Sequence, residues 1–169
     1  MSSKKTTLSS KSTNSFGQEE EEKHIYSFYR DELDEKEVSR MFNDVCLILT
    51  HLKPERIRFL RRVIHPSRRV ERVIQALWAL INSSVENSKK QSWRTTRVIV
   101  TKETVDILLK LEPSQADPEL IQELSEEYID DPAWDVDKIY HGSQAAGILA
   151  EWLCAFCAKV AFREAQNSE

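Results

Sequence analysis

Apolar side chains recur at three- and four-residue steps through residues 38–52. This spacing places them along one face of an α-helix, which should end before Pro54 because proline disfavours helical geometry in the residue that precedes it. The stripe consists of Val38, Met41, Phe42, Val45, Ile48 and Leu52. We predict a helix here that packs against one partner helix.

Two further helices are predicted on either side of Pro66. The first runs from Glu55 to Ile64 and segregates apolar from basic side chains. Its apolar side consists of Ile57, Leu60 and Ile64, and its basic side of Arg58, Arg61, Arg62 and His65. The second runs from about Ser67 to Asn82 and should bury Val70, Val73, Ile74, Leu77 and Ile81, with Arg68, Arg69 and Arg72 off that stripe.

The middle of the chain gives weaker signals. Residues 83–91 are polar and are predicted to form a loop. One or two helical pieces are expected between Trp93 and Leu111, although the β-branched run at 97–101 is also compatible with a strand. Thr101, with Thr104 nearby, is a suitable N-cap for the second piece.

Helix start signals return in the last third. Asp117 followed by Pro118 is typical of an N-cap and first helical residue, and it predicts a helix over 118–129. Either Asp135 or Asp137 should cap a short helix near Tyr140. The last helix is expected from about 143 to 165, with Ala145, Leu149, Trp152, Phe156, Val160 and Phe162 near one side. It should be the longest element and should pair with residues 38–52.

Composition favours one all-α domain. The chain has 169 residues, 40% of them hydrophobic, which suffices for one core. Three glycines and five prolines are few for the turns of a β-fold. We expect a disordered tail over 1–30, a helical domain over 31–165 and a disordered end over 166–169, since residues 1–23 hold almost no large apolar side chains. A transit peptide is the second interpretation of the tail, but the segment lacks arginines.

Charge is strongly segregated along a chain whose formal net charge is −4. Residues 54–72 hold seven arginines, whereas residues 112–137 hold ten acids and no lysine or arginine. A solvated helix face is the ordinary explanation of such a run. So many arginines with few nearby acids fit an acidic partner surface better. Nucleic acid is disfavoured as that partner because the rest of the domain is acidic.

Motifs for catalysis are weak. Cys154 and Cys157 match C-x-x-C but lie within an apolar helix, so core packing is the preferred interpretation. His141, Ser143 and Asp137 lie too close along one helix start to act as a hydrolase triad, and no phosphate-binding loop motif is present. We therefore expect a soluble intracellular protein that is not an enzyme, with no cofactor, metal or membrane-spanning segment.

Two ordered motifs carry a family resemblance. The first is Tyr128-Ile-Asp-Asp-Pro-Ala-Trp-Asp135, and the second is Ser143-Gln-Ala-Ala-Gly-Ile-Leu-Ala-Glu-Trp152. Together with the basic helix, the His65-Pro66-Ser67 turn and the tryptophan-led segment at Trp93, they resemble the microtubule-binding domain at the tip of the dynein heavy-chain stalk, especially of axonemal dyneins. The resemblance covers residues 38–163.

The resemblance implies a small helical bundle on a short antiparallel coiled-coil base that binds tubulin in the cytoskeleton of a cilium or flagellum. In the family, basic residues matching Lys53 and Arg61 contact tubulin, and a basic residue stands where this chain has His141. Tubulin's outer surface is acidic, so the whole arginine cluster is expected to contribute. The expected tubulin-binding residues are Lys53, Arg58, Arg61, Arg62, His65, Arg68, Arg69 and His141.

Two departures from the family pattern leave an alternative open. Glu151 replaces a frequent lysine with the opposite charge, and the stalk is nearly absent, so nothing would shift one helix along the other. A binder of fixed affinity is expected. The alternative is an adaptor that keeps the fold and binds another axonemal, dynein-associated or cytoskeletal protein.

Overall fold

The computed structural model describes residues 34–169, which fold into helices and turns with no β-strand among them. The all-α prediction is therefore confirmed for this part of the chain. The tail predicted over residues 1–30 lies outside the described residues. At the other end, the last helix includes Gln166 and Asn167, which were expected to belong to a disordered end.

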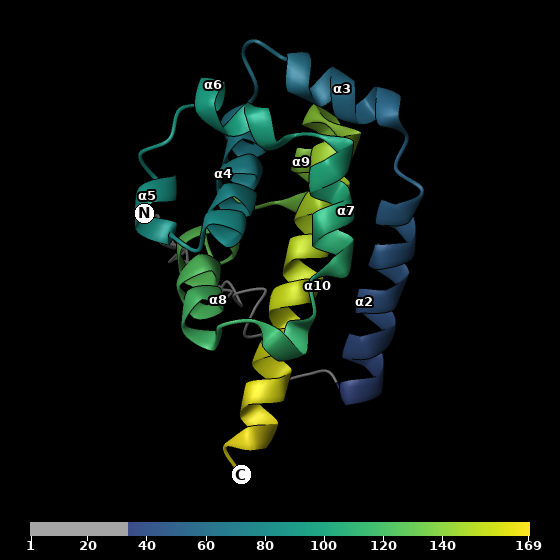
Figure 1. The fold of residues 1–169 in the computed structure, drawn as a ribbon, viewed down its shortest axis with the longest axis vertical. Helices are drawn as coiled ribbons and strands as arrows, with labels where there is room; N and C mark the ends of the chain where they lie inside the picture. Colours follow the sequence, from purple (N-terminus) through teal and green to yellow (C-terminus); the bar gives the residue numbers. More distant parts are fainter. Residues whose placement is uncertain (1–33) are drawn as a thin grey trace, which may run out of the picture.

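The helices follow one another through short connections (Figure 1). The α-helices are α2 (Glu35–Thr50), α3 (Pro54–Arg62), α4 (Arg68–Asn82), α5 (Val85–Ser88), α6 (Trp93–Thr96), α7 (Lys102–Lys110), α8 (Pro118–Leu124), α9 (Val136–Gly142) and α10 (Gln144–Asn167). Two 3-10 turns, η1 (Arg97–Ile99) and η2 (Pro113–Gln115), and one π-helix, η3 (Ser125–Ile129), complete the described part.

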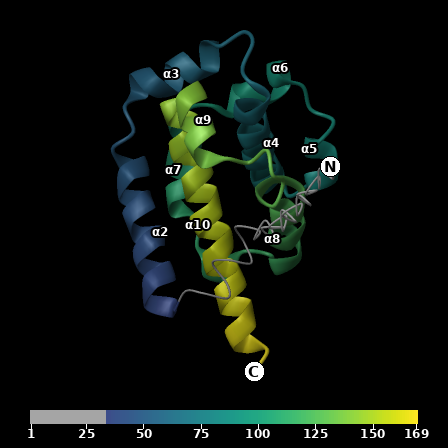
Figure 2. The same cartoon turned by 180° about the vertical axis from the view of Figure 1, so that it is seen from behind.

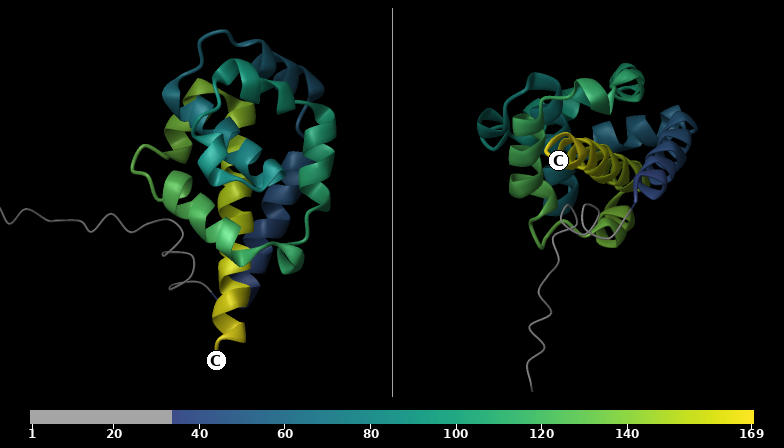
Figure 3. Two further views of the ribbon diagram at one scale, coloured as in Figure 1. Left: turned by 60° about the vertical axis from the view of Figure 1, so that its left-hand side comes forward. Right: turned by 90° about the horizontal axis from the view of Figure 1, so that it is seen from below.

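The longest of these helices, α10, forms the centre of the molecule (Figure 3). The sequence predicted one apolar side, but α10 is buried nearly all round through its first two thirds because α2, α4, α8 and α9 all pack on it. Its length and composition would allow it to cross a membrane. However, 83% of its most apolar stretch is buried inside the protein, as in the core helix of a soluble domain.

Helices α2 and α10 form an antiparallel pair, as predicted. Lys159 Nζ donates to Ser39 Oγ over 2.6 Å, and the Phe42 and Phe156 rings lie 6.2 Å apart, so partners run in opposite directions (Figure 2). The predicted stripe is wrong at one position. Ile48 is largely exposed, and its neighbour Leu49 is fully buried instead.

Capping side chains define several helix starts. Thr101 Oγ1 accepts from the Thr104 amide over 3.2 Å, and Asp117 accepts from the Glu119 amide over 3.1 Å, as predicted. Asp135, rather than Asp137, caps α9 by accepting from the Lys138 amide. Residues 97–101 form a 3-10 turn and a cap instead of the strand considered as an alternative.

Two elements differ from the predictions. The segment predicted as a polar loop contains α5. Ser88 of this helix is buried, and its Oγ forms a hydrogen bond of 2.6 Å with the hydroxyl of Tyr128. The helix predicted over 118–129 changes to a π-helix at Ser125, where the Asp130 amide donates to the Ser125 carbonyl over 2.8 Å. The extra residue per turn helps to place Tyr128 against α5 and α4.

The two motifs that carry the family resemblance are mainly structural here. Tyr128, Trp134 and Trp152 are buried in the core. Ser143 caps α10 by accepting from the Ala146 amide over 3.1 Å. Gly147 lies directly against the Tyr140 ring, so that a Cβ atom there would be closer than 3.0 Å to ring carbons.

Candidate functional site

Helix α3 crosses one end of the molecule and carries most of the predicted site (Figure 1). Pro54 occupies the first helical turn, where a missing amide hydrogen costs nothing. Ile57 and Leu60 are buried and fix α3 on the start of α10. The guanidinium groups of Arg58, Arg61 and Arg62 are therefore held on the outside of a rigid helix.

The turn after α3 is held by a tryptophan. Trp93 Nε1 donates to the Val63 carbonyl over 2.7 Å, which ties the start of α6 to the segment between α3 and α4. His65 and Arg68 are both exposed on either side of Ser67. Ser67 caps α4 by accepting from the Val70 amide over 3.3 Å. The end of α3 and the start of α4 thus form one supported surface.

Helix α9 brings His141 to the same end of the molecule. Gly142 packs on the start of α4, where a Cβ atom would lie 3.1 Å from Val70 Cγ2 and 3.3 Å from Ser67 Oγ. His141 precedes this glycine and is exposed. The structure therefore brings together predicted residues that lie far apart in the sequence. We call this surface the basic end: Lys53, Arg56, Arg58, Arg61, Arg62, His65, Arg68, Arg69 and His141.

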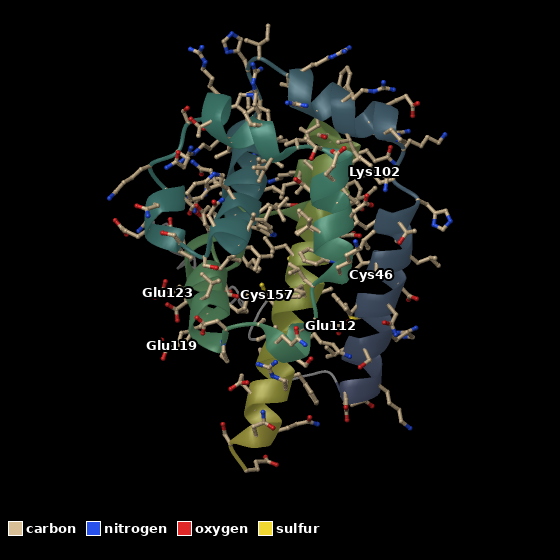
Figure 4. All side chains as sticks on the ribbon, in the orientation of Figure 1. Cys46, Lys102, Glu112, Glu119, Glu123 and Cys157 are labelled. Carbon is tan, nitrogen blue, oxygen red and sulfur yellow. The ribbon has the colours of Figure 1, made fainter. Side chains whose placement is uncertain are left out.

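Few internal acids neutralise the basic end. Arg58 pairs with Glu55 and Arg68 with Glu71, each over 3.5 Å. Both arginine side chains stay more than 60% exposed, so these pairs are weak and screened by salt. Within residues 34–169, no carboxylate forms an ion pair with Arg61 or Arg62. Nitrogen-tipped side chains accordingly gather around α3, whereas labelled acids lie on and near α8 (Figure 4).

Two arginines of the same sequence run face inward. Arg69 is only half-exposed and lies near Asp135, the carboxyl group whose pKa is lowered chiefly by the Lys138 backbone amide and in part by this arginine. Arg72 is 15% exposed and contacts the π-helix through Glu127 and Tyr128. Arg69 contributes least of the predicted site arginines to the outer surface, and Arg72 contributes to the fold.

Sequence analysis missed two apolar side chains at the basic end. Phe59 and Ile64 are each 73% exposed. Ile64 was predicted on the buried side, but α3 ends at Arg62 and the chain is extended at Val63, so the helical periodicity no longer applies. Phe59 lies between Arg58 and the buried Leu60. A large aromatic residue within a mainly basic run is the sequence signal that could have identified it as a candidate contact residue.

Basic side chains also extend the end beyond the predicted set. Arg56 is exposed on α3, although the sequence interpretation did not include it among the site residues. Arg94 is exposed on α6, which the Trp93 hydrogen bond holds beside the Val63 turn. The helical periodicity of residues 54–62 places Arg56 to one side of the buried Ile57 and Leu60, so the sequence could have identified it as an exposed residue. The place of Arg94 depends on tertiary packing.

Glu151 has an internal role in the fold. It is half-buried on α10 and interacts with the Tyr140 hydroxyl of α9. Burial, followed by the neighbouring Glu151 carboxylate, raises the pKa of Tyr140 to about 12. The carboxylate therefore serves the contact between α9 and α10 instead of adding a free negative charge to the basic end.

The cysteine motif lies inside the core, as predicted. Cys154 and Cys157 are buried, and burial raises the pKa of the Cys154 thiol to about 12 and that of Cys157 even further above its usual range. Thiols with such values stay protonated and unreactive at neutral pH. Within residues 34–169, no group of three histidine, cysteine or acidic side chains has the geometry to hold a metal ion.

Comparisons with known proteins do not identify the chain. No protein-family model matches it, and no curated protein matches it.

Proposed function

We propose that this protein is a non-enzymatic module that binds microtubules through the basic end. The observation that carries the proposal is the outward position of Arg61 and Arg62, with no internal ion-pair partner in residues 34–169, on a helix fixed by Ile57 and Leu60. The resemblance to the dynein stalk tip supplies the partner, because in that family the residue matching Arg61 contacts tubulin.

The physical basis is charge complementarity. Guanidinium groups form bidentate hydrogen bonds with carboxylates, and tubulin presents acidic side chains outward. Because α3 is rigid, its side chains lose less freedom on binding than those of a flexible loop. Attraction of this kind speeds association and weakens as salt rises.

Phe59 and Ile64 support a docking role for the same surface. An aromatic side chain that is 73% exposed gains free energy when a partner removes it from water. Binding energy commonly concentrates in an aromatic or arginine residue near the centre of an interface. A mere solubilising surface would gain nothing from these two apolar groups.

The proposal includes the finer arrangement implied by the resemblance. In it, the antiparallel α2 and α10 correspond to the base of a shortened stalk, and the module belongs to the axoneme of a cilium or flagellum. The resemblance alone supports this location. The many contacts between α2 and α10 support a binder of fixed affinity.

Sedimentation with taxol-stabilised microtubules tests the proposal. The full chain should pellet at low salt and less so at moderate salt. Arg58→Glu/Arg61→Glu should weaken pelleting at least about tenfold, since two attractive charges become repulsive. The matched control is Lys36→Glu/Arg40→Glu on exposed positions of α2, which should bind as the unmodified chain does. Absence of pelleting at low salt, or equal losses in both variants, overturns the proposal.

A second candidate is an adaptor that binds another axonemal or cytoskeletal protein. The observation that favours it is the acidic outer side of α8 and the start of η3, where Glu119, Glu123 and Glu126 are all exposed. A pull-down in which one stoichiometric partner is recovered without microtubules, and is lost on Glu119→Lys/Glu123→Lys, would select this function. Retention of the partner in Arg58→Glu/Arg61→Glu would separate the two surfaces.

A further inference from the structure

A groove of about 560 Å³ lies between α8 and the last turns of α10, far from the basic end. Its floor is apolar and comes from Val160, Ala161 and Ala165 on α10, of which Ala165 is exposed and the other two are almost fully buried. Carboxylates from both sides form its rim. The rim acids are Glu119, Glu126, Asp130 and Glu164, of which Glu164 also pairs with Arg163 over 2.9 Å, and no lysine or arginine of residues 34–169 lines the groove.

The chain enters the described part of the molecule close to this groove. Glu35 and Val38 of α2 share a smaller pocket with Phe162 and Gln166 of α10. On α10 this pocket is lined by residues 159, 162, 163 and 166, and the groove by residues 160, 161, 164, 165 and 168, so the two linings centre on opposite sides of the helix. The segment that precedes Asp34 therefore starts about half a turn around α10 from the groove.

One of the two routes around α10 is covered by another segment of the chain. Arg163 donates to the carbonyls of Pro113 and Ala116, so η2 and the following turn cover that side. Half the circumference of a helix about 10 Å across is roughly 16 Å, which five extended residues span at about 3.3 Å each. Residues 29–33 are long enough for the other route and would bring residues 25–28 to the groove.

The sequence of that segment matches the groove. Residues 23–30 read KHIYSFYR and contain four large apolar side chains, two fixed positive charges and no acid. Acidic residues flank it on both sides, at 19–22 and 31–32. Apolar and basic character thus coincide with the stretch that can reach an apolar floor with an acidic rim, while the flanks would be repelled from that rim.

We propose that residues 23–30 of the chain itself occupy the groove between α8 and α10. Ile25, Tyr26 and Phe28 cover the apolar floor, and Lys23 and Arg30 face the rim carboxylates. The sequence alone favoured a disordered tail through residue 30, and the proposal moves that boundary to about residue 22. It does not depend on microtubule binding. A segment held at the groove and at the start of α2 also fixes the position of α2 along α10.

Photo-crosslinking in the full chain tests the location directly. A photoreactive phenylalanine analogue in place of Phe28 should link, within one chain, to residues 118–130 or 160–168. The matched control replaces Phe16, the nearest large aromatic side chain outside the segment, and should give no such link. Equal yields from both positions, or links to other surfaces, overturn the proposal. Links between isotopically distinct chains would show that a second copy fills the groove, which also overturns it.

Hydrogen exchange provides a second measurement. Tyr26→Ser/Phe28→Ser in the full chain should speed amide exchange about tenfold in α8 and in the last turns of α10, because those amides lose their cover. Amides of α4 should be unchanged, which separates local uncovering from general unfolding. Phe16→Ser is the control and should leave exchange as it is. Unchanged exchange in the double variant contradicts the proposal.

Discussion

Arg62 on α3 and Arg72 on α4 come from one basic run, yet the structure uses them in opposite ways. Arg62 is exposed and forms no ion pair within residues 34–169. Arg72 donates to the Glu127 carbonyl over 2.7 Å, pairs with Glu127 and Asp131 over 3.4 Å each, and lies 4.4 Å above the Tyr128 ring. The same run therefore supplies exposed cations such as Arg62, which a partner can reach, and the cation of Arg72, which stabilises the fold.

The contrast shows what a count of charges omits. Seven arginines in nineteen residues suggested one surface. Whether a guanidinium group is free depends on where the acids of a distant segment lie, and the π-helix with the turn after it brings Glu127 and Asp131 to Arg72. The free charge of the basic end is smaller than the sequence suggested, and it is concentrated on α3 and at the start of α4.

Arg72→Met should have the largest effect on stability. It leaves the partly buried Glu127 and Asp131 without their cation and removes the contact with Tyr128, so we expect a loss of about 3 kcal/mol in the free energy of unfolding. Urea denaturation measures this loss. A loss below about 1 kcal/mol would show that Arg72 stabilises the fold little more than an exposed arginine such as Arg62 does.

Gly147→Ala should have the next largest effect. The added Cβ would be closer than 3.0 Å to the Tyr140 ring, and overpacking of this kind costs about 2 kcal/mol. Because Tyr140 holds α9 in place, the variant should also displace His141 from the basic end. Thermal unfolding checks the loss. Gly142→Ala is the control and should lose less, since its nearest contact would be 3.1 Å.

Stability should fall at high pH through Tyr140. Its pKa is raised to about 12 in the folded protein, against 10.0 for the unperturbed side chain. Between these values the unfolded chain releases the proton while the folded protein retains it, so the free energy of unfolding decreases as pH rises. Tyr140→Phe should show a shallower decrease over this range in urea titrations. An unchanged slope would exclude ionisation of Tyr140 as its source.

Arg62→Ala should have the smallest effect on stability, within about 0.5 kcal/mol, because the side chain is exposed and unpaired in the described residues. Its effect on microtubule binding should be about threefold, consistent with one exposed charge. A pelleting isotherm and a urea titration on the same sample measure the two quantities. A larger loss of stability than of binding would reverse the comparison with Arg72.

The sequence predicted the elements whose signals are local. Caps at Thr101 and Asp117 depend on side chains next to the amides that they bind, so residue order alone reveals them. The pairing of α2 with α10 was also accessible, because a long apolar stripe needs a long apolar partner.

The rest depends on contacts between distant segments. The polar stretch forms α5 because Val85 is buried and Ser88 forms a hydrogen bond with Tyr128, forty residues further along the chain. Of the eight residues predicted for the candidate site, seven lie exposed at one end and Arg69 is partly buried. Phe59 and Ile64 were missed because their exposure depends on where α3 ends and on what covers it.

The π-helix over Ser125–Ile129 implies unequal tolerance of insertions and deletions along the chain. Removing one residue there would restore ordinary α-helical pitch, but it would swing the following side chains by about 100° and carry Tyr128 away from Arg72. Residues 89–92, which join α5 to α6, set no helical pitch, although the buried Gln75 side chain donates to the Gln91 carbonyl. Variation in length among related chains should therefore accumulate in that connection and spare the stretch between Asp117 and Pro132.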